Sequence, residues 1–280
     1  MTRRGAGMDL PGAKRIFFLI SCEHGGRRIP PAYEPLFAGC EPLLASHRGY
    51  DRGALVLARE MAAVLRAPLV AASISRLLVD LNRSPGHPAR FSEITRALPR
   101  AAQARIHRRY YLPYRQRVEQ LITHALSHDM HVIHISVHSF TPVLDGHVRT
   151  ADIGFLYDPA HPQEAALCTE WINALQARAP ELRLRRNYPY RGSSDGLCNS
   201  LRRRYPPELY TGVELEVNQR HAVGGGRGWG QLRADLIGAL LEVFDASDTE
   251  SASLGGAAAP LLGAATPLTS ALAARGLRGW

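Results

Sequence analysis

The chain has 280 residues, of which 45% are hydrophobic and 21% are charged. This composition excludes intrinsic disorder for most of the chain and a membrane-spanning protein, since no apolar run reaches the roughly 20 residues that a bilayer requires. The formal net charge is +9, from 34 basic and 25 acidic residues. The arginines are scattered along the chain and form no basic arm, so we expect neither nucleic acid nor a membrane as a partner.

Four cysteines are present without a CxxC pair or a regular spacing, which predicts reduced, largely buried thiols in a cytoplasmic protein. The two ends of the chain differ from the middle in composition. We therefore expect a flexible N-terminus over residues 1–12, a single folded α/β domain over 13–246, and a flexible tail rich in Ala, Gly and Ser over 247–280.

Strand-like and helix-like patterns alternate along this domain. In chain order we predict a strand at 16–20, a helix at 52–66, strands at 69–74 and 77–81, a helix at 101–128, a strand at 131–137, a helix at 163–178, a strand at 211–217 and a helix at 229–244. Pro113 should bend or split the long helix, because proline removes a helical hydrogen bond. Strands separated by helices of this length predict a mixed, largely parallel sheet that is covered on both faces.

Polar residues follow several of these strands, at the edge where a parallel sheet gathers its ligands. His24 stands between the strand 16–20 and two glycines, which let a metal or an anion approach the backbone closely. Asp51 opens the first helix, either as a cap or as a carboxylate ligand. Asn82 and Arg83 offer donors suited to a carboxylate, with a surface salt bridge as the alternative reading of Arg83.

Two later strands carry further candidates. Alternation along 131–137 places His134 and His138 on the same face. His138 ends the strand and suits a metal site, whereas His134 lies deeper and is predicted to be a core or supporting histidine. Glu214 and Glu216 share one face of the last strand, where burial of two carboxylates requires partners unless the strand lies at a solvated edge.

Together, two histidines and several carboxylates at strand ends suit a divalent metal with an open coordination position, zinc in particular. A neighbouring glutamate then serves as the base, and Arg and Asn hold an acidic substrate. The HExxH, Walker A and GxGxxG motifs of common alternatives are absent from the sequence.

Six short strings occur in an order that resembles the N-formylglutamate amidohydrolase family, which is related to the zinc carboxypeptidases and aspartoacylases. They are CEHGGRRIP, HRGYDRGA, VDLNRS, VHSFTP, NYPYRG and GVELEVNQR. The resemblance spans about residues 15–244. It implies a three-layer α/β/α fold of the zinc-carboxypeptidase and phosphorylase/hydrolase kind, with one zinc ion per chain.

The resemblance also implies residue roles. His24 and His138 match the two histidine ligands, and Asn82 and Arg83 match the pair that grips the substrate carboxylate. Glu214 matches the catalytic glutamate, although its neighbour Glu216 remains an alternative.

The third metal ligand departs from the pattern of the carboxypeptidase relatives. Their acidic ligand stands three residues after the first histidine, and Arg27 occupies that position here. Asp51 is our choice as the substitute, with Glu23 and His47 as alternatives. Arg191 is expected to stabilise either the oxyanion or the distal carboxylate of the substrate.

These assignments predict a zinc-dependent amidohydrolase that cleaves the formamide of N-formyl-L-glutamate or of a similar N-acyl acidic amino acid. The partner is then a small anionic substrate. A metal-dependent deacylase or carboxypeptidase-like hydrolase of different specificity is the nearest alternative, and a basic binding protein without catalysis is a more distant one.

Overall fold

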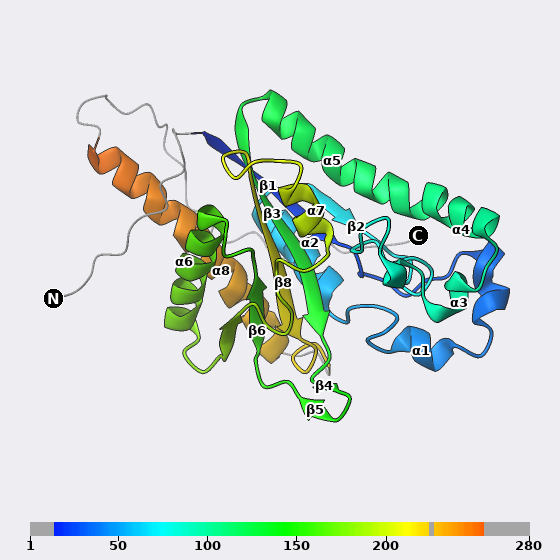
Figure 1. Ribbon diagram of the computed structural model, residues 1–280. Helices are drawn as coiled ribbons and strands as arrows, with labels where there is room; N and C mark the ends of the chain where they lie inside the picture. Colours follow the sequence, from blue (N-terminus) through cyan, green and yellow to red (C-terminus); the bar gives the residue numbers. More distant parts are fainter. Residues whose placement is uncertain (1–13, 224–226, 255–280) are drawn as a thin grey trace, which may run out of the picture.

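A six-stranded mixed sheet forms the centre of the structure, a computed structural model that describes residues 14–223 and 227–254 (Figure 1). Its strands, in spatial order, are β2 (Leu69–Ala71), β1 (Arg15–Cys22), β3 (Met130–Phe140), β8 (Tyr210–Asn218), β6 (Ile153–Leu156) and β7 (Leu184–Arg186). All neighbours run parallel except β8 and β6. The carboxyl ends of β1, β3 and β8 therefore meet at one edge of the sheet.

Helices cover both faces of this sheet (Figure 1), which confirms the three-layer α/β/α fold. One face packs against α2 (Ala54–Val64), α6 (Pro162–Arg178) and α8 (Arg227–Leu254), and the other against α5 (Leu112–Ser127) and α7 (Leu197–Arg202). Side chains alternate along β3, so Ile133, Ile135 and Val137 lie in the first core. The polar side chains between them belong to the opposite face.

Shorter elements complete the fold. They are η1 (Pro31–Phe37), α1 (Glu41–Ala45), η2 (Pro88–Arg90), α3 (Glu93–Arg96), α4 (Arg100–Ile106), η3 (His107–Tyr111), β4 (Val143–Leu144) and β5 (His147–Val148). The helix expected at 101–128 is split as Pro113 suggested: α4 passes into the π-helical turn η3, and α5 then begins with proline in its first turn.

The strand expected at 77–81 is wrong. These residues form a buried turn, in which Leu78 donates its backbone N–H to Ser75 and Asp80 donates to Arg90. An unbroken apolar run shows burial but does not show strand pairing, so a covered loop has the same pattern. The strand expected at 69–74 is shorter than predicted, with β2 ending at Ala71. Strands β6 and β7 and the hairpin β4–β5 were not anticipated.

The last helix runs past its expected end. The domain boundary placed at residue 246 falls inside α8, which continues to Leu254. Residues 1–13 and 255–280 lie outside the described part of the chain, so both predicted flexible ends remain largely predictions. All four cysteines are free thiols, and three are buried. No helix between residues 14 and 254, gap aside, is long and apolar enough to cross a bilayer.

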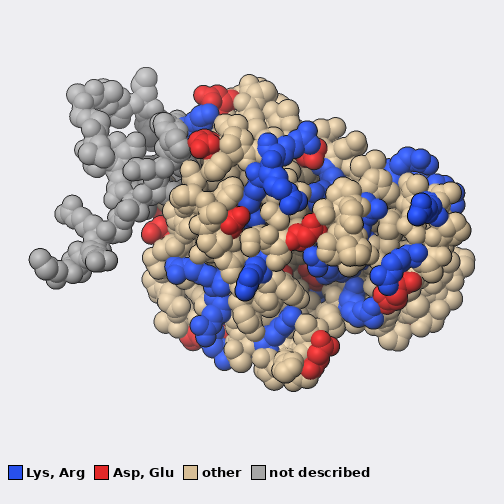
Figure 2. All heavy atoms as spheres, viewed as in Figure 1, with Lys and Arg blue, Asp and Glu red and all other residues tan. Residues whose placement is uncertain are grey.

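The basic residues are distributed over the surface. On the face shown in Figure 2, Lys and Arg side chains form several separate groups, with Asp and Glu side chains and uncharged surface between them. This face therefore lacks the continuous basic stripe that nucleic-acid binding favours.

Candidate active site

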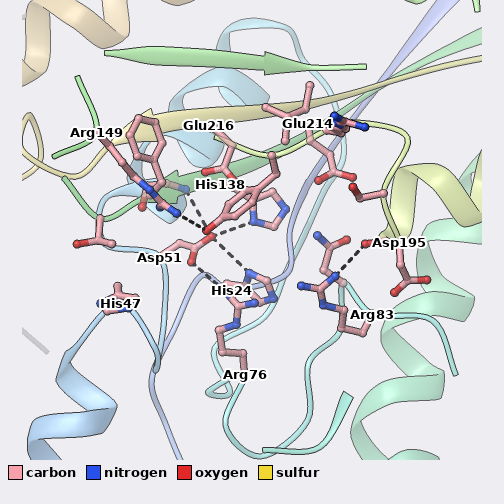
Figure 3. Close-up of a pocket in the computed structure, with 18 residues that line it drawn as sticks. His24, His47, Asp51, Arg76, Arg83, His138, Arg149, Asp195, Glu214 and Glu216 are labelled. Atoms are coloured by element: carbon pink, nitrogen blue, oxygen red, sulfur yellow. Dashed lines mark hydrogen bonds and ion pairs between the residues drawn. The ribbon is translucent and has the colours of Figure 1, made fainter. Parts of the chain in front are cut away.

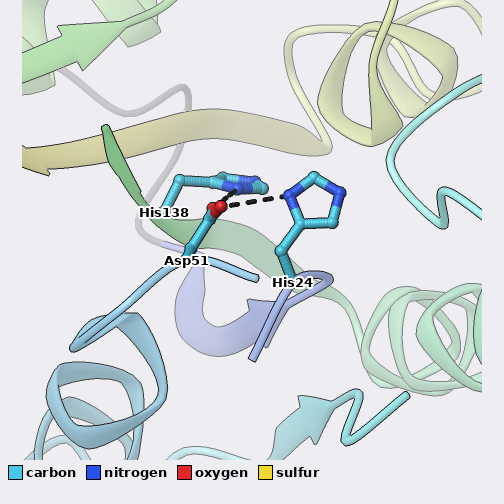
Figure 4. A group of neighbouring side chains, drawn as sticks. All are labelled: His24, Asp51 and His138. Atoms are coloured by element: carbon cyan, nitrogen blue, oxygen red, sulfur yellow. Dashed lines mark hydrogen bonds and ion pairs between the residues drawn. The ribbon is translucent and has the colours of Figure 1, made fainter. Parts of the chain in front are cut away.

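Three side chains converge at the carboxyl edge of the sheet: His24 after β1, Asp51 before α2, and His138 near the end of β3 (Figure 4). Their nearest ligand atoms all lie within 4.8 Å of one another. Asp51 Oδ2 lies 2.9 Å from His138 Nδ1 and 3.4 Å from His24 Nδ1. The two imidazole centroids are 5.0 Å apart, so residues distant in sequence form one cluster.

The structure shows that Asp51 is not the cap of the first predicted helix. Helix α2 is capped by Gly53, at a φ of 85°, without a side-chain hydrogen bond. The backbone N–H of Asp51 donates to the carbonyl oxygen of His24, which fixes the loop against the end of β1. The Asp51 carboxylate therefore faces the two histidines and does not cap the helix.

In each histidine of the cluster, the ring nitrogen that points away from Asp51 contacts a second carboxylate. His24 Nε2 lies 2.8 Å from Asp80 Oδ1, and Arg76 in turn binds the other Asp80 oxygen at 2.8 Å. His138 Nε2 lies 3.0 Å from Glu23 Oε2. Both Nδ1 atoms therefore point toward Asp51, and both Nε2 atoms point away from it.

Charges within the cluster set its pKa values. Burial alone would lower the pKa of His138, but its hydrogen bonds to Asp51 and Glu23 raise it well above the usual value. Burial and Arg76 lower the pKa of His24, yet Asp80 and Asp51 outweigh them and raise it. Without a metal, the cluster therefore favours protonated imidazoles.

The pKa values of the carboxylates at the cluster are shifted downward, whereas those of the histidines are shifted upward. Burial would raise the pKa of Asp51, but His24 and His138 hold it below its ordinary range. Burial would likewise raise the pKa of Asp80, which Arg76 and His24 keep low. These carboxylates therefore remain ionised at neutral pH.

The cluster forms the floor of a cavity of about 270 Å³ (Figure 3). This volume lies below the roughly 300–1,000 Å³ of pockets for drug-sized ligands, so a small substrate fits. Arginines stand on both sides of the cluster, with Arg83 toward one end and Arg149 toward the other. Exposed Arg191 and His47 also line the cavity, and neither belongs to the cluster.

Asn82 and Arg83 lie on the loop that follows Asp80. Asn82 Oδ1 accepts a hydrogen bond from the backbone N–H of Leu197 at 2.6 Å, which ties this loop to α7. Arg83 Nη1 donates to the carbonyl oxygen of Asp195 at 3.1 Å. The loop is thereby fixed while both side chains still line the cavity.

Glu214 and Glu216 both line the cavity, but they stand in different surroundings. Glu216 pairs in register with His138, and its carboxylate lies beside that of Asp51 (Figure 3). Glu214 pairs with Ser136 and is hydrogen-bonded by Asn82. Burial raises the pKa of Glu214, and burial together with Asp51 and Glu214 raises that of Glu216 to about 8.

Arg149 was not identified from the sequence. Its Nη2 donates to the Tyr190 hydroxyl at 3.3 Å, and its guanidinium carbon lies over the rings of Tyr190 and Phe140, 5.2 and 5.9 Å from their centroids. Within the described chain its Nη1 atom is buried and has no hydrogen-bond partner. A half-buried guanidinium with a free donor in a cavity is suited to an anionic ligand group.

His134 is a core histidine, as its depth in the strand predicted. Its Nδ1 lies 2.7 Å from the Tyr210 hydroxyl and its Nε2 lies 2.8 Å from Ser21 Oγ. Burial lowers its pKa to about 4, so the ring is neutral.

The His24–Asp51–His138 cluster fits a divalent metal ion. Two ligands at zinc bond lengths of 2.0–2.1 Å in a tetrahedral site are about 3.3 Å apart. The two ligand-atom separations at Asp51, 2.9 and 3.4 Å, are close to this spacing, and the ligand atoms of the two histidines lie within 4.8 Å of each other. Histidines whose outer nitrogen meets a carboxylate are typical of zinc ligands. Nitrogen and carboxylate donors also suit other first-row ions.

The sequence patterns did not identify Asp80 and Arg76, which support His24, or Arg149, which lines the cavity. Asp80 stands two residues before Asn82 in a string already singled out, so its position was a usable signal. Arg149 carries no such signal, because the unanticipated β4–β5 hairpin brings it to the cavity.

An α/β/α fold with a polar cavity at the strand ends, lined by histidines and carboxylates, is typical of hydrolases that act on small substrates. The sequence model of the N-formylglutamate amidohydrolase family matches residues 16–222. The chain belongs to this family and is an amidohydrolase.

Solved structures agree with this fold. A gene product of Agrobacterium tumefaciens, Atu2144, superposes with a TM-score of 0.71 and 27% identity, covering 84% of this chain and 93% of that one. An N-formylglutamate amidohydrolase from Ralstonia eutropha JMP134 superposes with a TM-score of 0.63 and 19% identity, covering 86% and 97%. No curated protein matches the sequence.

Proposed function

We propose that this amidohydrolase hydrolyses the formamide of N-formyl-L-glutamate, or of a similar N-acyl acidic amino acid, with zinc held by His24, Asp51 and His138. The observation that carries the proposal is one small cavity with a metal-ligand cluster at its floor, two buried glutamates above it and arginines on both sides. When bound, the metal supplies Lewis-acid polarisation of the amide carbonyl and lowers the pKa of water.

Glu216 is the general base in this proposal. Its carboxylate stands beside the cluster, and its Oε2 is a buried atom without a hydrogen-bond partner in the described chain. It takes the proton of the attacking water and passes it to the departing amine nitrogen, so formate and the free amino acid leave. Glu214, which the resemblance favoured, is hydrogen-bonded by Asn82.

Asn82 and Arg83 hold the α-carboxylate of the substrate in this proposal. Replacing Arg83 with methionine is expected to raise KM for N-formyl-L-glutamate by about 10- to 100-fold, because a hydrogen bond to a charged group contributes roughly 1.5–3 kcal/mol. The value of kcat should change much less if this contact binds substrate and transition state equally. Steady-state kinetics measure both constants, and an unchanged KM would contradict the assignment.

Arg149 or Arg191 holds the side-chain carboxylate, and the half-buried setting of Arg149 favours it. Replacing Arg149 with methionine is expected to remove about tenfold or more of the preference for N-formyl-L-glutamate over N-formyl-L-glutamine. Arg191→Met is the matched control and should leave this ratio of kcat/KM values unchanged. The reverse outcome would assign the carboxylate to Arg191.

Zinc binding should release protons. In the metal-free protein the pKa of His138 is raised well above its usual value and that of His24 is raised as well, so both imidazoles bind protons that zinc must displace. We expect release of more than one proton per zinc ion at pH 7, and affinity that increases with pH. Calorimetry in two buffers of different ionisation enthalpy measures the release, and a value near zero would contradict this.

A substrate panel tests the proposed function. Formate or amine release is measured with N-formyl-L-glutamate, N-acetyl-L-glutamate, N-formyl-L-glutamine and a dipeptide, before and after chelation and zinc add-back. We expect N-formyl-L-glutamate to react fastest, only with metal. A preference for the acetyl compound or the dipeptide would instead favour a deacylase or a carboxypeptidase-like hydrolase. Full activity after complete metal removal would exclude the zinc mechanism.

A further inference from the structure

Glu23 is a fully buried carboxylate that the proposed reaction does not use. It follows directly after β1, and it does not line the cavity. Its Oε2 accepts a hydrogen bond from Ser136 Oγ at 2.6 Å and lies 3.0 Å from His138 Nε2. Its Oε1 accepts a hydrogen bond from the Tyr114 hydroxyl at 2.9 Å.

The position of Glu23 does not suit a metal ligand, because His138 lies between it and the rest of the cluster. His138 stands between Glu23 and Asp51, with Nε2 toward Glu23 and Nδ1 toward Asp51. An imidazole that binds a metal through one nitrogen carries its proton on the other, and that N–H requires an acceptor. Glu23 Oε2 lies 3.0 Å from His138 Nε2, on the side of the ring away from Asp51, and is placed to accept this hydrogen bond. The Ser136 hydroxyl, which donates to the same Glu23 oxygen, lies 2.9 Å from the same nitrogen, so Glu23 also holds the other neighbour of this N–H in place.

We infer that Glu23 is the positioning residue of the metal site: it fixes the ring and tautomer of His138 and supplies the second negative charge that a buried dication requires. The inference rests on the metal site of the proposed function. His24, Asp51 and neutral His138 together contribute a single negative charge as ligands. The partners of Glu23 from Tyr114 and Ser136 are uncharged hydroxyls, so its own charge is not neutralised on that side.

Asp80 differs from Glu23 in this respect. It supports His24 in the same way, but Arg76 pairs with it at 2.8 Å and offsets its charge. Of the two supporting carboxylates, Glu23 is therefore the one whose charge is available to the cation. Partners of this kind change metal affinity by about 10- to 100-fold when they are removed.

The experiment compares zinc affinity in Glu23→Gln and wild-type protein by competition with a chelator. We expect about 10- to 100-fold weaker zinc binding, and an altered visible spectrum after cobalt substitution, since the field at His138 changes. Glu164→Gln is the matched control: Glu164 is also fully buried, but it pairs with Arg202 away from the cluster. This control should lose stability and keep its zinc affinity. Zinc affinity within twofold of wild type in folded Glu23→Gln would overturn the inference.

A measurement on the wild type covers the case in which Glu23→Gln does not fold. Nitrogen-15 NMR of the zinc-loaded protein should show His138 protonated at Nε2 and zinc-bound through Nδ1, with a strongly deshielded ring N–H. Zinc bound through Nε2 would overturn the inference but leave the proposed hydrolase intact. Absence of zinc from the cluster would overturn both.

Discussion

Replacing Glu216 with glutamine is expected to lower kcat on N-formyl-L-glutamate by about 10²–10⁴-fold, the usual contribution of a general base. Glutamine keeps the shape of the side chain but cannot accept the proton of the attacking water. Zinc content should stay at one ion per chain, because Glu216 is not among the clustered ligand residues. Stopped-time formate assays and elemental analysis of the same sample measure both quantities.

Glu214→Gln is the matched control, since Glu214 lies on the same strand and the same face. Its expected loss of kcat is much smaller, because its carboxylate is hydrogen-bonded by Asn82. If Glu214→Gln abolished turnover and Glu216→Gln retained it, the catalytic role would belong to Glu214, as the family resemblance suggested.

The same Glu216→Gln substitution should stabilise the metal-free protein at alkaline pH. Burial raises the pKa of Glu216 from 4.5 to about 8. Between these values the unfolded chain ionises the group while the folded chain keeps its proton, so stability is lost as pH rises through this range. The variant escapes that loss and should melt above wild type at pH 8, with little difference near pH 5. Equal melting temperatures at pH 8 would contradict the assigned burial of an unpartnered acid.

Asp51→Asn is expected to weaken zinc binding by at least about 100-fold, more than the loss of a supporting residue behind a ligand. The substitution removes both the anionic ligand and the charge that both Nδ1 atoms face. Activity at limiting zinc should fall in parallel and recover in part at high zinc. Chelator competition gives the dissociation constant.

Asp195→Asn serves as the control for Asp51→Asn. Asp195 lines the same cavity, but its carboxylate accepts a hydrogen bond from the backbone of Ser84 at 3.0 Å and belongs to no ligand cluster in the described chain. Its zinc affinity should match that of wild type. Undiminished zinc binding by Asp51→Asn would return Glu23 and His47 to consideration as the third ligand.

Much of the fold follows from local sequence patterns. The apolar alternation of 131–137 predicted both the strand and the face on which His138 stands, and the ends of parallel strands predicted where polar residues gather. Burial misled the assignment of 77–81, because a covered loop requires the same apolar side chains as a strand. The short strands β6 and β7 have too few residues for a periodic signal.

The positions of His24 and His138 in the candidate site were predictable, because each is a histidine at the end of a predicted strand. The residue patterns alone did not show which side chains lie together, and the choice of Asp51 came from the family resemblance. Whether Asp51 capped a helix or faced the histidines depended on residues 27 and 87 positions away. The partner of Glu23 is 91 positions distant at Tyr114, and Arg149 reaches the cavity only through a hairpin. Such contacts arise from tertiary packing, which a single sequence does not encode locally.

The location of the metal is tested most directly by anomalous diffraction at the zinc edge from crystals of zinc-loaded, active protein. We expect one strong peak, bonded to Nδ1 of His24, Nδ1 of His138 and the carboxylate of Asp51. A peak held by other residues, or no peak at this cluster in protein that hydrolyses N-formyl-L-glutamate, would contradict this expectation.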